Sequence, residues 1–238
     1  MVNVQDDTRE EEIRTLAGLE KIGGRTDVDA HLTDYPEYGN IPFELKSSTG
    51  KSVSTGRDVG HDHLTKWDSI DWLVGFYIEV NNELSLSELY HFGPGDLDWF
   101  KEKISYIEAD YVLLDLISQS VDDSFVTRIF GDDDEFDVKI VKKFLKQQKM
   151  YPSGERLKVG MIQEMADLPS GIFSRSAMVQ VVKERAKYLV HRGGTLNNPH
   201  IPKSKIEEVG NKLDISNPDR VQSQLRSLIL RRLRNDSH

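Results

Sequence analysis

Three charged side chains near the N-terminus have the types and spacing needed for phosphodiester chemistry. Asp29 lies fourteen residues before Phe43-Glu44-Leu45-Lys46. Side chains alternate between the two faces of a β-strand, so Glu44 and Lys46 share one face while Phe43 and Leu45 are directed to the other. Asp29 would close the polar surface from a preceding strand. Two carboxylates and an ammonium arranged in this way can hold Mg²⁺ against a phosphodiester and stabilise the charge that develops during hydrolysis.

The neighbouring sequence predicts the strands that would position these groups. Residues 26–32 alternate between apolar and polar side chains, and residues 42–47 do the same, which is typical of half-buried strands. Residues 34–40 contain Pro36 and Gly39 and are expected to form the turn of a hairpin. The continuous apolar run at residues 72–78 indicates a strand that is buried on both faces.

Helices are expected around these strands and through most of the second half of the chain. The spacing of apolar residues predicts them at residues 8–21, 61–69, 96–107, 135–150, 176–190, 204–213 and 218–234. Residues 47–60 are expected to form a long connection, and residues 89–92 a further strand. The order of elements indicates the α/β class, with a mixed β-sheet core flanked by helices and a mainly helical second half.

The charge of the chain is divided unevenly along its length. Its 238 residues carry a net charge of −9, but residues 1–138 hold 11 Lys/Arg and 31 Asp/Glu, whereas residues 139–238 hold 20 and 9. We expect an acidic region at 1–138 that binds metal and a basic, mainly helical region at 139–238 that contacts phosphates. A single integrated domain is the alternative.

The composition excludes some classes of site and suggests a compartment. The chain has no cysteine, which excludes disulfides and thiolate metal sites and fits a reducing, cytoplasmic location. No apolar run is long enough to cross a bilayer, and the first residues do not resemble a signal peptide, so no membrane partner is expected. Phosphate-loop, dinucleotide-binding and Gly-X-Ser-X-Gly patterns are absent from the sequence.

Four segments carry a resemblance to a known family. They are RTDVDAHL at 25–32, IPFELKSS at 41–48, GHDHLTKW at 60–67 and DWLVGFY at 71–77. Their order resembles the PD-(D/E)XK nuclease superfamily, in particular type II restriction endonucleases, over roughly residues 8–80, about a third of the chain. Val28, rather than proline, precedes Asp29, so Asp27 competes with Asp29 as the first acidic residue of the motif.

The resemblance implies a restriction-endonuclease-like fold, with the PD-(D/E)XK catalytic core at 1–138. It implies that Asp29, Glu44 and the backbone carbonyl of Leu45 bind Mg²⁺. Lys46 would position or activate the attacking water and offset charge on the scissile phosphate. Family members often add a carboxylate from the first helix, for which Glu12 and Glu20 are candidates; a solvated helix face is the alternative role for both.

The resemblance also implies an activity and a set of partners. The expected function is that of a Mg²⁺-dependent type II restriction endonuclease, which hydrolyses double-stranded DNA at a specific sequence as a homodimer. Residues 139–238 would then serve in dimerisation as well as in DNA binding. The alternatives are a structure-specific nuclease, such as a junction resolvase or repair nuclease, and a DNA-binding regulator without catalysis. A protein-interaction module remains a further alternative if the charge division serves only solubility.

Residues for DNA contact are expected mainly in the second half of the chain. Arg175 is the preferred recognition residue, because it would begin a helix capped by Ser174. The expected phosphate contacts are Lys66, Lys139, Lys142, Lys143, Lys146 and Lys149, and the expected groove contacts are Arg156, Arg175, Gln180, Arg192, Asn197 and Asn198. His61 and His63 form a His-X-His pair for which DNA contact or simple exposure is favoured over metal binding.

Overall fold

The computed structural model describes residues 4–22, 28–146 and 165–235. Its contacts divide the chain into two compact units. Unit 1 contains the described parts of residues 1–59, 63–104 and 196–238, and unit 2 those of residues 60–62 and 105–195. The first and the last described residues therefore both belong to unit 1, and unit 2 is built mainly from an internal segment.

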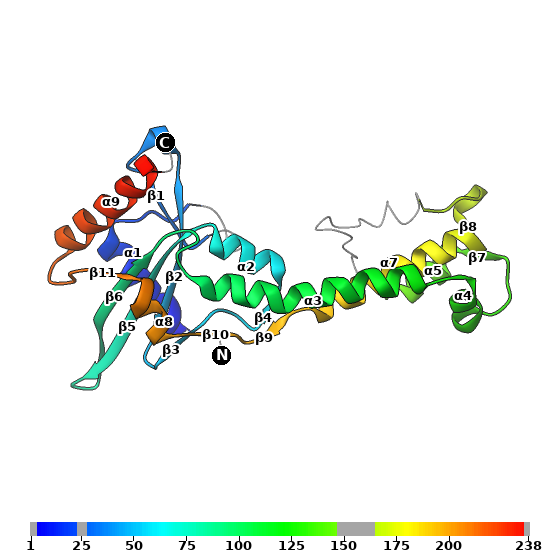
Figure 1. The fold of residues 1–238 in the computed structure, drawn as a ribbon, viewed down its shortest axis with the longest axis horizontal. Helices are drawn as coiled ribbons and strands as arrows, with labels where there is room; N and C mark the ends of the chain where they lie inside the picture. The colour runs from blue at the N-terminus through cyan, green and yellow to red at the C-terminus, as the bar shows by residue number, and fades with distance from the viewer. Residues whose placement is uncertain (1–3, 23–27, 147–164, 236–238) are drawn as a thin grey trace. The chain divides into compact units, whose positions relative to one another are not determined.

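Unit 1 is organised around a five-stranded mixed sheet (Figure 1). The strand order is β1-β2-β5-β6-β11, and every neighbouring pair is antiparallel except β2 and β5, which are parallel. The strands are β1 (Ala30–Leu32), β2 (Ile41–Ser48), β5 (Asp71–Val80), β6 (Glu83–Phe92) and β11 (Asn211–Lys212). The predicted hairpin and the predicted central strand are thus confirmed as β1–β2 and β5.

A crossover connection joins the two parallel strands, as parallel pairing requires. It contains β3 (Ser52–Ser54), β4 (Asp58–Val59) and α2 (His61–Asp68), where the sequence predicted only a connection and one helix. The short strands exist because returning chain pairs with them: β10 (His200–Pro202) with β3, and β9 (Leu196–Asn197) with β4. A single turn of 3₁₀ helix, η1 (Pro36–Tyr38), lies in the hairpin connection.

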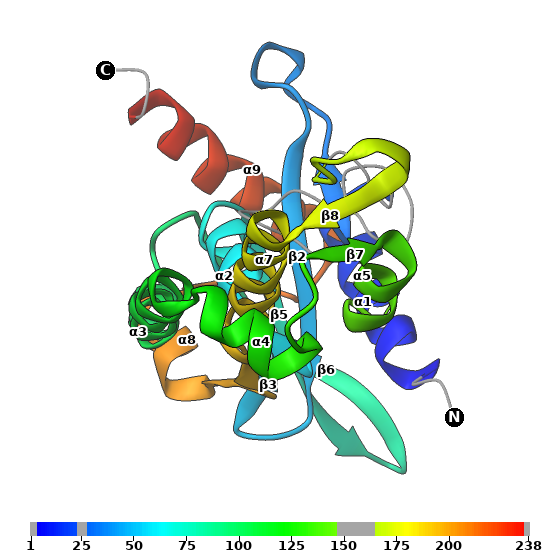
Figure 2. The same cartoon turned by 90° about the vertical axis from the view of Figure 1, so that its right-hand side faces the viewer.

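Two helices from opposite ends of the chain cover one face of the sheet. They are α1 (Val4–Ala17) and α9 (Pro218–Asn235), which Figures 1 and 2 show beside the strands. Ile13 of α1 and Leu225 of α9 are fully buried in one cluster with Phe43 and Leu73 of the sheet. On the opposite face Trp72 packs against Trp67 of α2 and Phe100. The sheet is therefore buried on both faces at β5, as its continuous apolar run predicts.

Unit 2 has a separate, smaller core. Phe136, Phe173, Met178 and Val181 are fully or almost fully buried in it. Its elements are α3 (Asp98–Ser120, from residue 105 onward), α4 (Asp123–Phe130), β7 (Glu135–Asp137), α5 (Val138–Phe144), η2 (Pro169–Gly171), β8 (Ile172–Ser174) and α7 (Arg175–Gly193). Strands β7 and β8 pair to close this core. Ser174 caps α7 by accepting from Ala177 N at 3.2 Å, as predicted.

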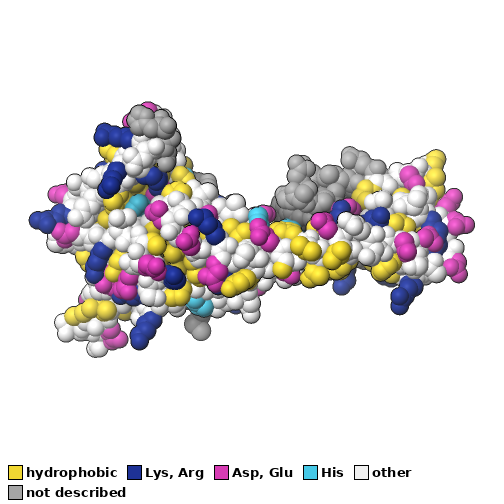
Figure 3. Space-filling view, viewed as in Figure 1, with side chains coloured by type: hydrophobic (Ala, Val, Ile, Leu, Met, Phe, Trp, Pro, Cys, Tyr) yellow, Lys and Arg dark blue, Asp and Glu magenta, His cyan; other side chains and the backbone are white. Residues whose placement is uncertain are grey.

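Two predicted helix ends are wrong for identifiable reasons. Of the helix predicted at 135–150, residues 147–150 lie outside the described residues. The preceding part is a strand followed by a short helix, because the Asp137 carboxylate accepts from Lys139 N at 2.7 Å and starts α5 there. The helix predicted to end near residue 107 continues to Ser120. Val112, Leu113 and Leu116 stay exposed on α3 within unit 2, where Figure 3 shows hydrophobic side chains at the surface. Because apolar residues also lie on the exposed side of α3, their spacing does not show the one-sided pattern from which a helix is predicted.

Other predicted boundaries also shift. The helix predicted at 204–213 is α8 (Lys203–Val209), and the strand β11 follows it. The strand predicted at 26–32 has described pairing only over Ala30–Leu32, since residues 23–27 lie outside the described residues. No helix in the described part of the chain is both long and apolar enough to cross a membrane.

The domain boundary predicted at 138/139 is not where the compact units divide. The last helix, α9, returns to unit 1 because its apolar face is buried against α1 and the sheet. The charge contrast does not follow the units either, since residues 60–62 and 105–195 hold 13 Lys/Arg and 15 Asp/Glu. Unit 2 contains the acidic residues of α3 and α4 together with the lysines of α5, so their charges offset one another.

Candidate active site

The candidate site lies at the edge of β2, beyond the point where β1 ends. The register pairs Ala30 with Phe43, and Asp29 N donates one more bond to Phe43 O at 3.1 Å. Past that point no strand among the described residues pairs with this edge of β2. Backbone groups left unpaired at such an edge need other partners. Side chains of the site supply them.

The three predicted residues converge on this edge. The Asp29 carboxylate accepts from Leu45 N at 2.9 Å through Oδ2. The Lys46 ammonium donates to Leu45 O at 3.0 Å and lies 2.7 Å from Glu44 Oε1 and 3.5 Å from Asp29 Oδ2. The predicted convergence of Asp29, Glu44 and Lys46 is therefore present.

Burial and charge act in opposite directions on the two strand residues. Only 10% of the Glu44 side chain is exposed, and this burial raises the pKa of its carboxyl, while Lys46 opposes the rise. Burial alone would lower the pKa of Lys46, but the carboxylates of Glu44, Asp29 and Glu10 outweigh it and raise that pKa. Lys46 is thus held as an ammonium ion across the ordinary pH range.

Trp67 is a site residue that the sequence prediction missed. It lies on α2, almost buried, and its side chain hydrogen-bonds to the Glu44 carboxyl, which favours the carboxylate. Its backbone carbonyl accepts from the Trp72 indole at 2.9 Å, which ties α2 to the strand beside β2. The crossover helix thereby orients one of the acidic groups. The order GHDHLTKW in the sequence offered a signal, but only for Lys66 as a phosphate contact.

Glu10 is the second residue that was missed. Its Oε1 lies 3.8 Å from the Lys46 ammonium, so the first helix does contribute a carboxylate to the site. Helix α1 reaches the sheet closely because position 75 is glycine: a Cβ there would lie 2.7 Å from Ile13 Cδ1. The Tyr77 hydroxyl donates to Arg9 O at 3.1 Å, next to Glu10, and so fixes the helix.

The other acidic candidates have different surroundings. Glu12 accepts from the Tyr77 hydroxyl at 3.0 Å, and Glu20 accepts from the Thr33 hydroxyl at 3.1 Å. Both contacts anchor structure rather than the site. Asp27 lies outside the described residues, whereas Asp29 is in place at the β2 edge.

The oxygen atoms of the site fit a hard divalent cation by type. Carboxylates and backbone carbonyls are the preferred ligands of Mg²⁺ and Ca²⁺. Asp29, Glu44 and Leu45 O would hold such an ion, with Glu10 close by. Within the described residues, no group of three or more acidic or imidazole side chains is arranged to hold a metal ion. The oxygens surround the Lys46 ammonium instead.

The two histidines of the His-X-His pair have separate aromatic neighbours. The His61 ring packs edge-on against Tyr111, with 5.3 Å between ring centroids, and the exposed His63 lies 5.9 Å from the Trp67 ring. The roles expected for the pair, DNA contact or simple exposure, stay predictions.

The predicted DNA contacts are divided between the units. Lys66, Asn197 and Asn198 belong to unit 1; Lys139, Lys142, Lys143, Lys146, Arg175, Gln180 and Arg192 belong to unit 2; Lys149 and Arg156 lie outside the described residues. Lys66, Lys139, Lys143 and Lys146 are exposed and Lys142 is half-buried, so each can be reached from solvent. They stay predictions.

Three of these residues also have structural partners. Arg175 donates to the Asp123 carboxylate at 2.6 Å, to two backbone carbonyls at 2.8 and 3.2 Å, and to Thr127. Arg192 donates to the Tyr188 hydroxyl at 2.7 Å, and Asn198 accepts from Ser54 at 3.1 Å. Arg175 in particular uses most of its N–H groups inside unit 2, which does not favour it as the base-reading residue.

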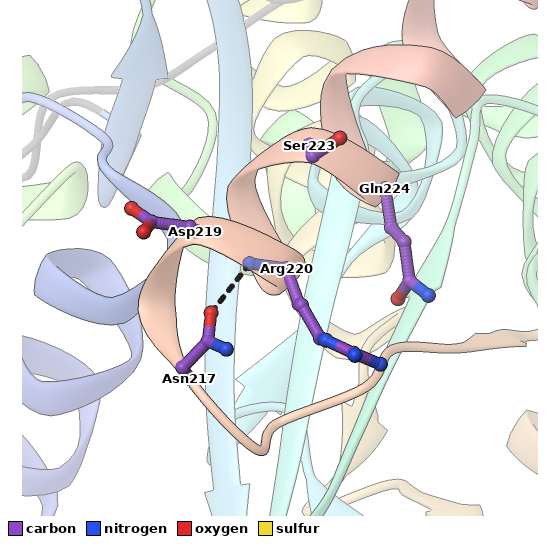
Figure 4. A pocket seen from close by; sticks show the side chains of 5 residues that line it. All are labelled: Asn217, Asp219, Arg220, Ser223 and Gln224. Atoms are coloured by element: carbon purple, nitrogen blue, oxygen red, sulfur yellow. Dashed lines mark hydrogen bonds between the residues drawn. The ribbon is translucent and has the colours of Figure 1, made fainter.

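A hollow at the start of α9 is lined by polar side chains (Figure 4). Asn217 Oδ1 accepts from Arg220 N at 3.0 Å, which caps the helix. The Arg220 guanidinium pairs with Asp214 at 2.6 Å, and Gln224 accepts from Asp214 N at 2.7 Å. These groups satisfy one another, so this hollow is a helix cap rather than a ligand site.

Comparison with known proteins adds no further assignment. No protein-family model matches the chain, and no curated protein is significantly similar to it in sequence.

Proposed function

We propose that this protein is a Mg²⁺-dependent DNA endonuclease with a restriction-endonuclease-like core, and that it acts as a type II restriction enzyme. The observation that supports the proposal is the convergence of Asp29, Glu44, Lys46 and the Leu45 carbonyl at one strand edge. The parallel pair β2–β5 joined through α2, and the carboxylate from α1, agree with it.

The chemistry follows from these groups. Asp29, Glu44 and the Leu45 carbonyl would hold Mg²⁺, which when bound makes its water more acidic and stabilises negative charge on a phosphate. Burial raises the pKa of the Glu44 carboxyl, and the Lys46 ammonium and the Trp67 hydrogen bond oppose that rise and favour the carboxylate. Lys46 stays protonated and places a positive charge beside the site, where it offsets charge that develops on the scissile phosphate.

The direct test is incubation of the purified protein with supercoiled plasmid, with Mg²⁺ or with EDTA, followed by sequencing of the ends. Discrete, sequence-defined ends that require Mg²⁺ are expected. A homodimer with two sites should linearise the plasmid without accumulating nicked circles. Cutting only at branched DNA would identify a structure-specific nuclease instead, and sequence-specific retention without cutting would identify a regulator.

Glu44→Ala and Lys46→Ala should each lower the cleavage rate by roughly a hundredfold to a thousandfold while DNA binding is retained. Each removes a charge at the scissile phosphate but leaves in place the residues proposed to contact DNA elsewhere. Glu83→Ala and Lys51→Ala are matched controls on exposed positions of the same unit and should cleave normally. Full cleavage by either site variant would defeat the proposal.

A further inference from the structure

Four oxygen atoms surround the Lys46 ammonium. Glu44 Oε1 lies 2.7 Å from the nitrogen and Leu45 O 3.0 Å, at hydrogen-bonding distance, while Asp29 Oδ2 lies at 3.5 Å and Glu10 Oε1 at 3.8 Å. Only 17% of the Lys46 side chain is exposed. These groups come from α1, from the residue before β1, and from β2 itself. One cation therefore holds three separate segments together.

These are the same oxygens that would hold a divalent cation. Lysine presents a compact point charge on a flexible stem, so its ammonium can substitute for a small ion and can also swing away. Three carboxylates around one ammonium leave a formal charge of −2 in a partly buried place. Additional positive charge there is favoured, because the carboxylates repel one another where water is scarce.

We propose that Lys46 is an internal substitute for the divalent cation: its ammonium holds Glu10, Asp29 and Glu44 in place until a cation displaces it. The displaced ammonium then turns away from the Leu45 carbonyl and becomes available to the scissile phosphate of the substrate. Cation binding and the presentation of Lys46 to substrate are thereby coupled. The inference rests on the proposed function only for what the cation does after it binds.

Competition between the Lys46 ammonium and the cation has consequences that can be measured. In Lys46→Met the carboxylates lose their internal cation, so the cation-free protein should be less stable, with a melting temperature lower by roughly 5 °C or more. Mg²⁺ or Ca²⁺ should restore that stability, since either ion takes the same place. The dissociation constant for Ca²⁺ should be at least about tenfold lower than in the unmodified protein, because no ammonium has to be displaced.

The test combines thermal unfolding in EDTA, Mg²⁺ and Ca²⁺ with calorimetric titration of Ca²⁺. Lys51→Met is the matched control, an exposed lysine of the same unit, and should behave like the unmodified protein. Glu44→Gln added to Lys46→Met should remove the gain in cation affinity. A Lys46→Met protein as stable in EDTA as the unmodified one, or one that binds Ca²⁺ no more tightly, would overturn the inference.

Further results decide for or against the inference if Lys46→Met does not fold, and separate it from the proposed function. If Lys46→Met does not fold in EDTA, it should fold when Mg²⁺ is added, and failure to do so counts against the inference. If Lys46→Met binds Ca²⁺ more tightly but the unmodified protein does not cut DNA, the inference is supported and the proposed nuclease function is defeated. If the unmodified protein cuts DNA but Lys46→Met leaves the Ca²⁺ affinity unchanged, the nuclease function is supported and the inference is overturned.

Discussion

At the scale of residues, each group of the site meets a structural need as well as a chemical one. Asp29 accepts from the Leu45 amide, and Lys46 donates to the Leu45 carbonyl, so both backbone groups of an unpaired edge residue are satisfied. The short strand β1 makes this possible, because a longer one would occupy that edge with its own backbone. The side chains proposed for the chemistry are thus the same ones that satisfy the backbone groups at the edge of β2.

Glu10 provides a prediction at this scale. Glu10→Gln removes one of the three carboxylates around Lys46 without changing the shape of the side chain, and should lower the cleavage rate about tenfold or more through weaker cation binding. The rate should recover in part at higher Mg²⁺. Glu11→Gln is the matched control, because Glu11 is exposed on the same helix and pairs with Arg14. Equal rates for the two variants would remove Glu10 from the site.

At the scale of elements, a buried ion pair fastens the last helix to the sheet. Asp71 begins β5, is 1% exposed, and accepts from His91 of β6 at 2.8 Å. Arg232 of α9 donates to both of its carboxylate oxygens, one of them at 2.8 Å. The paired geometry compensates a charge that would otherwise be buried alone. This contact therefore adds direction to the apolar packing of α9.

Removal of the arginine tests this attachment. Arg232→Met should lower the free energy of unfolding by about 3 kcal/mol, because it leaves Asp71 buried with only His91 as partner. Arg231→Met, at the exposed neighbouring position, should change stability by no more than about 0.5 kcal/mol. Urea denaturation of both variants gives the comparison. A small and equal effect would show that the Asp71–Arg232 ion pair does not stabilise the attachment of α9.

At the scale of the whole molecule, unit 1 needs both ends of the chain. Val221, Leu225 and Ile229 of α9 are fully buried in the same cluster as Ile13 and Phe43. Unit 2, by contrast, is made from an internal segment with its own core. The acidic first part of the sequence, residues 1–138, therefore does not coincide with either compact unit, although its charge suggests a domain.

A fragment experiment follows from this arrangement. Residues 1–138 alone should fail to fold, because the sheet loses α9 and with it a large part of the core on one face. Circular dichroism and the dispersion of amide NMR signals measure this directly, with the full chain as control. A well-folded 1–138 fragment would instead support the boundary expected from charge.

The sequence by itself determined what depends on neighbouring residues. The alternation of side chains along β2 places Glu44 and Lys46 on one face, and the hairpin brings Asp29 beside them, because both depend on short stretches of chain. The apolar run of β5 and the cap at Ser174 are local signals of the same kind. Only the tertiary structure decided that Glu10 and Trp67 join the site and that α9 completes unit 1. Those contacts depend on how closely α1 approaches Gly75 and on packing between residues far apart in the chain, which no local pattern records.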